Sequence, residues 1–106
     1  MNIIITGGSG FIGSNVIRKL LDEFENINII SIDNYLSGKK ENETNDTRVK
    51  YITDSTWNIN KNDLYKKFNP DILYHFGEYS RIYQSFDEPI KLFESNMRGT
   101  YQVIEF

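Results

Sequence analysis

Three glycines near the start of the chain have the spacing of an anion-binding loop. Gly7, Gly10 and Gly13 follow a β-branched run at residues 2–5 and open a stretch with helical spacing. At such a junction Gly7 allows a tight turn, Gly10 lets a ligand approach the backbone, and Gly13 lets the helix pack closely on the sheet. The first amides of the helix and the positive end of its dipole then attract an anion. We therefore predict that the loop holds the pyrophosphate of a dinucleotide; the alternative is a turn that binds nothing.

A carboxylate at the end of the second expected strand indicates which dinucleotide. Asp33 follows an isoleucine-rich run and lies 20 residues after Gly13. A carboxylate at this place accepts hydrogen bonds from the ribose hydroxyls of the adenosine and repels the additional phosphate of NADP. The sequence therefore favours NAD. The competing interpretation is that Asp33 only forms a turn before Asn34.

The elements that would position these residues alternate between strands and helices. Short apolar runs predict strands at residues 2–5, 28–32, 49–53 and 71–76. Helical spacing predicts helices at residues 10–24, 60–68 and from Pro89 to the end, whereas residues 37–47 are polar and predict a loop. This alternation implies parallel strands with right-handed crossovers. We predict an α/β fold: an incomplete Rossmann-type doubly wound sheet of about four strands in the order 3-2-1-4, with residues 1–106 forming part of one NAD-binding domain.

Composition excludes several classes of function. The 106 residues carry a formal net charge of -3 with scattered basic residues, so we expect no nucleic-acid or membrane partner. The absence of cysteine excludes disulfides, thiolate metal sites and a cysteine nucleophile, and we expect no metal site. The only histidine, His75, is expected to be structural. Without a signal-peptide pattern or a long apolar run, the chain is expected to be cytoplasmic.

Several motifs together resemble the extended short-chain dehydrogenase/reductases, especially NAD-dependent nucleotide-sugar epimerases and dehydratases. Residues 6–14 resemble the opening of that family, and residues 33–42 are similar to the loop after the second strand in UDP-glucose 4-epimerases. The family pattern is also matched by Asp54, by His75-Phe76-Gly77, by Ser85 and Pro89, and by residues 96–100.

The resemblance implies a set of residues that contact NAD. With the glycine loop included, this set is Gly7, Gly10, Phe11, Ile12, Gly13, Asp33, Asn34, Ser37, Gly38, Asp54, Ser55, Phe76, Gly77 and Ser80. It also implies transient oxidation of a sugar carbon in a sugar nucleotide. The chain departs from the family at Glu78, where a small residue is usual. A carboxylate there could repel the phosphates of a sugar nucleotide or could bind a hydroxyl.

Catalysis in this family needs a tyrosine followed four residues later by a lysine on one face of a helix. Only Tyr35 has such a partner, Lys39, and the intervening Ser37-Gly38 disfavours a helix. We therefore name no catalytic residue and expect the chain to be the N-terminal portion of a longer enzyme, without its substrate domain and inactive alone. The alternatives are a non-catalytic NAD-binding module and an interaction domain that binds no cofactor.

A sheet that stops at its fourth strand leaves backbone groups unpaired at its edge. We also expect the last helix to expose Phe93, Met97, Val103 or Ile104, or some of these. Self-association, and so a homo-oligomer, is the expected consequence.

Overall fold

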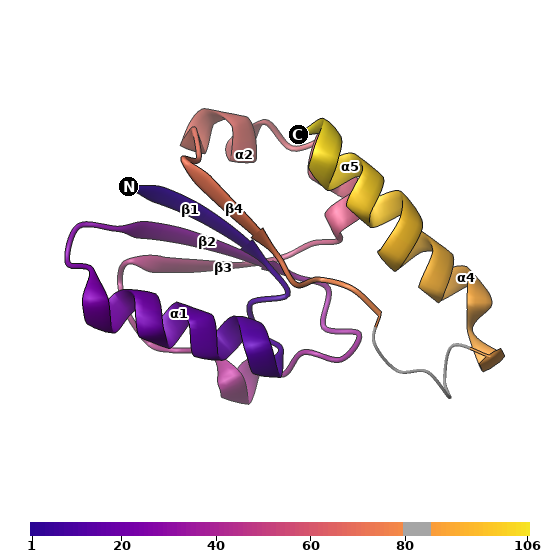
Figure 1. The fold of residues 1–106 in the computed structure, drawn as a ribbon, viewed down its shortest axis with the longest axis horizontal. Helices are drawn as coiled ribbons and strands as arrows, with labels where there is room; N and C mark the ends of the chain where they lie inside the picture. Colours follow the sequence, from indigo (N-terminus) through magenta and orange to yellow (C-terminus); the bar gives the residue numbers. More distant parts are fainter. Residues whose placement is uncertain (80–85) are drawn as a thin grey trace.

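Four parallel strands form the single sheet of the computed structural model, which describes residues 1–79 and 86–106 (Figure 1). They are β1 (Asn2–Thr6), β2 (Asn28–Asp33), β3 (Val49–Thr53) and β4 (Ile72–His75). Their order is β3-β2-β1-β4, with Ile3 opposite Ile29 on one side and Ile72 on the other. The predicted Rossmann-type order 3-2-1-4 is confirmed.

Helices cover both faces of this sheet (Figure 1). One face carries α1 (Phe11–Glu23), and the other carries α2 (Asp63–Phe68) and the C-terminal helix. The C-terminal helix consists of α4 (Pro89–Leu92), a π-helical stretch η3 (Phe93–Gly99) and α5 (Thr100–Glu105). Short 3₁₀ turns occur at η1 (Lys40–Asn42) and η2 (Thr56–Asn58). Among the described residues, no helix has the length and hydropathy to cross a membrane.

The core consists mainly of isoleucines that alternate between the two faces. Ile3 and Ile5 pack with Ile17 of α1, while Ile4 packs with Tyr65 of α2 on the opposite face. All five side chains are fully buried. Burial of one such aliphatic side chain stabilises the fold by about 1.5–3 kcal/mol. Because helices cover both sides of the sheet, its strands need apolar side chains on both faces.

The ends of the helices follow local sequence signals. The Asn62 side chain accepts a hydrogen bond from the Leu64 amide at 3.0 Å, so α2 begins at Asp63, later than residue 60, where the spacing had predicted its start. Asn69 closes α2 in the left-handed conformation, and Pro70 follows. Pro89 occupies the first turn of α4, the position where its missing amide costs nothing.

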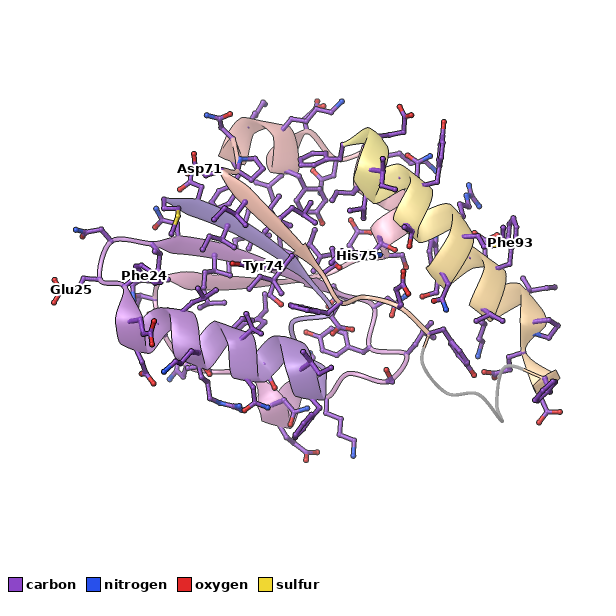
Figure 2. The ribbon with its side chains drawn as sticks, viewed as in Figure 1. Phe24, Glu25, Asp71, Tyr74, His75 and Phe93 are labelled. Carbon is purple, nitrogen blue, oxygen red and sulfur yellow. The ribbon has the colours of Figure 1, made fainter. Side chains whose placement is uncertain are left out.

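The C-terminal helix packs on η2 with a small residue, Gly99 against Thr56, and leaves large apolar residues exposed. Ser95 and Gly99 are buried, whereas Phe93, Met97 and Ile104 are 51%, 64% and 78% exposed. Figure 2 shows Phe93 on the side of the helix away from the sheet. Of the four residues expected to be exposed, only Val103 packs against the core. In the described sheet β4 is an edge strand, as predicted.

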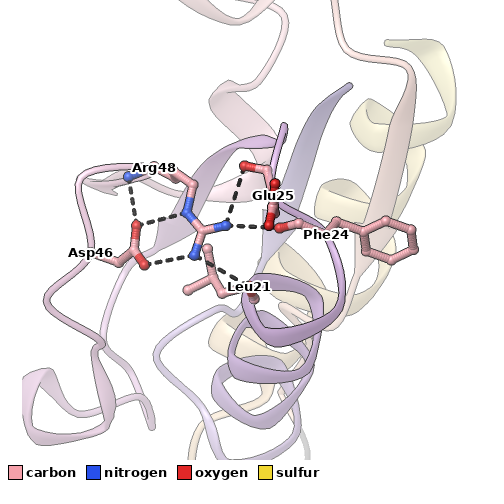
Figure 3. A network of polar contacts seen from close by, with 5 residues as sticks. All are labelled: Leu21, Phe24, Glu25, Asp46 and Arg48. Carbon is pink, nitrogen blue, oxygen red and sulfur yellow. Dashed lines mark hydrogen bonds and ion pairs between the residues drawn. The ribbon is translucent and has the colours of Figure 1, made fainter.

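Arg48 fastens the end of α1 to the segment that leads into β3 (Figure 3). Its guanidinium donates to the carbonyl of Leu21 at 3.2 Å and to that of Phe24 at 2.8 Å. It is itself held by Asp46, whose two oxygens accept at 3.1 and 2.9 Å. A cation at this end also suits the negative end of the helix dipole. The two residues therefore close the C-terminus of α1.

This contact makes stability depend on pH in a definite range. Arg48 lowers the pKa of Asp46 from 3.8 to about 2. Because the pKa is lower in the folded state, the Asp46 carboxylate contributes stability above about pH 4, and that contribution is lost as the pH falls toward 2. We expect Asp46→Asn to be less stable than the wild type in urea at about pH 6, with the gap closing between pH 4 and 2. A gap of equal size at both ends of this range would contradict the assignment.

Candidate functional site

The three glycines of the loop have separate roles in the structure. Gly7 has φ 74°, and a Cβ there would lie 2.8 Å from the Phe76 carbonyl and the Gly77 amide. A Cβ on Gly13 would lie 2.2 Å from the Gly7 oxygen. A Cβ on Gly10 would meet only that same oxygen, at 3.3 Å. The fold therefore requires Gly7 and Gly13, whereas Gly10 leaves space in front of the helix.

The N-terminus of α1 opens onto this space. Gly10 is the N-cap residue, and no side chain in the described part of the chain caps it. The first-turn amides of Phe11, Ile12 and Gly13 have no acceptor within the helix. The side chains of Phe11 and Ile12 at this helix start are 82% and 61% exposed. A helix start of this kind attracts anions, and the sequence predicted an anion site at this place.

Ser9 joins the glycine loop to the segment that follows β2. This fully buried residue donates from its amide to Asp33 at 3.0 Å and from its hydroxyl to Glu43 at 2.6 Å. Its carbonyl accepts from the Lys39 amide and the Asn42 side chain, both at 2.9 Å. Sequence reasoning missed Ser9 and Glu43, because no local pattern pairs residues 34 positions apart.

The Asp33 carboxylate is anchored by backbone amides at the end of β2. One oxygen accepts from the Ser9 amide and the other from the Tyr35 amide at 2.8 Å. Gly38 packs against it so closely that a Cβ would lie 2.6 Å from the carboxylate. Since a carboxylate has about four acceptor positions, Asp33 can still accept hydroxyl hydrogens from a ligand.

A second group of polar residues lies beside Asp33, at the end of β3. The Asn34 side chain donates to the Ser55 hydroxyl at 3.3 Å. Asp54 accepts from the Ser55 amide at 2.8 Å and from the Tyr65 hydroxyl at 2.9 Å. Burial raises the pKa of Tyr65, so this hydroxyl stays protonated and remains a donor. These contacts fix the loop after β3 next to the loop after β2.

Most of the predicted cofactor residues line one cleft at the carboxyl ends of the strands. Of the predicted set, nine line it: Gly7, Gly10, Asp33, Asn34, Ser37, Gly38, Asp54, Phe76 and Gly77. The lining also includes Ile32, Leu36, Thr56, Glu78, Tyr79 and Ser95, which were not in that set. The start of α1 adjoins the cleft and contains Phe11, Ile12 and Gly13. Ser55 is not part of the lining, but its hydroxyl accepts a hydrogen bond from Asn34, which lines the cleft. Ser80 lies outside the described residues.

A chain of hydrogen bonds runs behind the cleft from the loop after β4 to α5. The Gly77 amide donates to the Thr6 hydroxyl at 3.0 Å, and that hydroxyl contacts Nδ1 of His75 at 2.6 Å. Nε2 of His75 contacts the Thr100 hydroxyl at 3.1 Å, which donates to Glu78 at 2.7 Å. Burial lowers the pKa of His75, so the ring is neutral at pH 7, and the order of donors places its proton on Nε2. Figure 2 shows the ring between β4 and the C-terminal helix, which agrees with a structural role.

Tyr35 and Lys39 do not form a catalytic pair. Tyr35 has φ 60°, and Lys39 has an extended backbone, so the two are not on one helix face. The Tyr35 hydroxyl donates to Glu43 instead. Burial and this hydrogen bond raise the pKa of Tyr35, the opposite of what a tyrosinate base needs. Tyr35 and Lys39 therefore lack the helical arrangement that the family's tyrosine and lysine need.

The sheet order and the cleft at the strand ends define a Rossmann-type dinucleotide-binding unit. Residues 3–106 match the NAD dependent epimerase/dehydratase family, and the chain belongs to it. The predicted family is thereby confirmed, as is NAD as the cofactor on which this family depends.

Individual relatives agree with this assignment. The chain is 29% identical to dTDP-glucose 4,6-dehydratase of Haemophilus influenzae, over 99% of its own length and 32% of the relative's. It superposes on the UDP-glucose 4-epimerase of Thermotoga maritima, solved with UDP-glucose, with a TM-score of 0.86 and 29% identity. The match covers 99% of this chain and 33% of the epimerase chain. For the Thermus thermophilus UDP-glucose 4-epimerase in complex with NAD, the TM-score is 0.83 with 26% identity and coverage of 99% and 33%. The chain thus spans about a third of the length of the relatives it matches.

The glycine geometry predicts that stability and ligand access depend on different positions. Gly7→Ala and Gly13→Ala should each lower the free energy of unfolding by about 1–3 kcal/mol, because a Cβ would strain or clash with the backbone. Gly10→Ala should cost less than about 1 kcal/mol, since it changes an N-cap residue whose added Cβ would lie 3.3 Å from the Gly7 oxygen, a contact that a small shift relieves. Urea unfolding of the wild type and the three variants measures these losses in the free energy of unfolding. Equal losses at all three positions would refute the separation of roles.

Proposed function

We propose that this chain binds NAD in the cleft and forms the cofactor-binding portion of a nucleotide-sugar epimerase or dehydratase. The observation that carries the proposal is the uncovered start of α1 at Gly10, which shares one cleft with the carboxylate of Asp33. An anion-binding helix end and a ribose-binding carboxylate are the two contacts that a dinucleotide needs.

In the proposed complex NAD lies across the cleft from β2 to β4. The pyrophosphate would lie on the first-turn amides of Phe11 and Ile12, and the adenosine ribose would lie on Asp33. Since Asp33 ends β2 and the glycine loop follows β1, the remaining half of the cofactor extends toward β4 and Gly77. When bound, the nicotinamide supplies the hydride acceptor. The described residues bind and orient it, and Thr6 and His75 hold the loop after β4 in place.

The proposal also names a substrate class and a type of reaction. The relatives are a dTDP-glucose dehydratase and UDP-glucose epimerases, which supports transient oxidation of a sugar carbon in a sugar nucleotide. The tyrosine–lysine pair implied by the family resemblance would come from outside these 106 residues. We therefore propose that the chain alone does not turn over sugar nucleotides. Turnover by the isolated chain would contradict this part.

Calorimetric titration tests the cofactor. We expect NAD to bind at least about tenfold more tightly than NADP, a difference of about 1.4 kcal/mol, because Asp33 and Asp54 repel the additional phosphate. Gly10→Ala should weaken NAD binding by about tenfold or more while the variant stays folded. Glu23→Gln, an exposed change at the other end of α1, is the control and should bind as the wild type does.

If NAD gives no heat and no thermal shift, the interaction domain becomes the better hypothesis. If NAD binds but the longer protein has no tyrosine–lysine pair, the non-catalytic NAD-binding module is favoured.

We also propose that the chain associates with itself through β4 and the C-terminal helix. β4 is an edge strand of the described sheet, and Phe93, Met97 and Ile104 are exposed on the C-terminal helix. We expect the mass measured by light scattering to rise with concentration, and Ile104→Lys to reduce that rise. A monomer at high concentration would remove the homo-oligomer from the proposal.

A further inference from the structure

Glu78 lies at the β4 end of the cleft, away from the carboxylates of the adenosine side. Asp33 ends β2 and Asp54 follows β3, whereas Glu78 lies in the loop after β4. In the strand order β3-β2-β1-β4, the glycine loop after β1 separates the two groups. A dinucleotide with its adenosine ribose on Asp33 and its pyrophosphate on α1 therefore brings its nicotinamide half to the side of Glu78.

The Glu78 side chain is held in place by its neighbours. Its Oε1 accepts from the Thr100 hydroxyl at 2.7 Å and lies 3.4 Å from Nε2 of His75. The backbone is fixed as well, because the Glu78 amide donates to the Phe76 carbonyl at 2.9 Å. Both side-chain contacts in the described part of the chain use Oε1. The carboxylate therefore remains part of the cleft lining with Oε2 available to it.

No described residue of the cleft lining compensates the negative charge of Glu78. Among the described lining residues the ionisable side chains that carry charge are Asp33, Asp54 and Glu78, with no lysine or arginine. His75 is neutral at pH 7, because its burial lowers the pKa of the ring. The described residues at the β4 end of the cleft thus place one uncompensated carboxylate there, which favours a cationic group.

We propose that Glu78 makes this site prefer oxidised NAD⁺ over NADH. The inference rests on the proposed function, because it requires NAD in the cleft. The nicotinamide ring carries a positive charge in NAD⁺ and none in NADH, so a nearby carboxylate stabilises the oxidised form selectively. A reaction that begins by oxidising a sugar needs its bound cofactor in that form. Glu78 is a specificity-determining residue for the redox state of the cofactor.

The test is the ratio of two dissociation constants, that of NADH divided by that of NAD⁺, measured by titration calorimetry on the folded chain. Glu78→Gln should lower this ratio by about three- to tenfold, the size expected for one charge several ångströms away in a partly hydrated site. The glutamine keeps the size of the side chain and an oxygen that accepts from Thr100. Glu78→Asp, which keeps the charge, should retain most of the preference.

Matched control variants distinguish the effect of the charge at Glu78 from the effects of a change in net charge or in folding. Glu23→Gln removes one carboxylate from an exposed pair with Lys19 and should leave the ratio unchanged. Thr100→Val removes the hydroxyl that holds Glu78 and should lower the ratio part of the way, whereas Thr100→Ser should restore it.

The possible results lead to different conclusions. If both cofactor forms bind and Glu78→Gln leaves their ratio unchanged, the inference is wrong while the proposed function stands. An equal loss of affinity for both forms would also overturn it, since Glu78 would then only shape the cleft. If neither form binds, the proposed function fails and the inference fails with it.

Discussion

The close fit of the turn after β1 constrains the rest of the molecule. Gly7 lies against the backbone at the end of β4, and Gly13 of α1 lies against the Gly7 oxygen. These contacts leave no room for side chains, so the strand, the helix and the neighbouring strand end are fixed relative to one another. The uncovered start of α1 is a consequence of this packing.

A second level of organisation joins the loops that follow the strands. Ser9 connects the glycine loop to Asp33 and Glu43, and Thr6 connects the end of β1 to His75 and the loop after β4. Each connection is made through a buried or partly buried polar group that would be costly to leave without a partner. The loops around the cleft are therefore held by hydrogen bonds among themselves as well as by the sheet beneath them. A cleft held in this way is largely formed before any ligand binds.

The features that could be predicted from sequence are those encoded locally. The predicted bounds of β3 agree with the structure, and Asn69-Pro70 ends α2, because a β-branched run and a left-handed cap act over a few residues. The glycine spacing and Asp33 identify the cleft for the same reason.

What could not be predicted depends on residues distant in sequence. Glu43 reaches Ser9, and Thr100 reaches Glu78, through the packing of whole elements. The π-helical stretch η3 also has no local signal in the spacing of apolar residues. That spacing marks a large apolar face, whereas the buried face of η3 carries Ser95 and Gly99, with Gly99 against Thr56 of η2.

The two sides of the C-terminal helix are therefore open to different kinds of sequence change. On the inner side a Cβ on Gly99 would lie 2.2 Å from the Thr56 hydroxyl, so volume is what limits substitution there. On the outer side Met97 and Ile104 are exposed, so their size is not limited by packing. The polarity of the residues there decides whether that surface favours solvent or a protein partner. Homologues should therefore keep small residues on the inner side of this helix and vary in both size and polarity on the outer side.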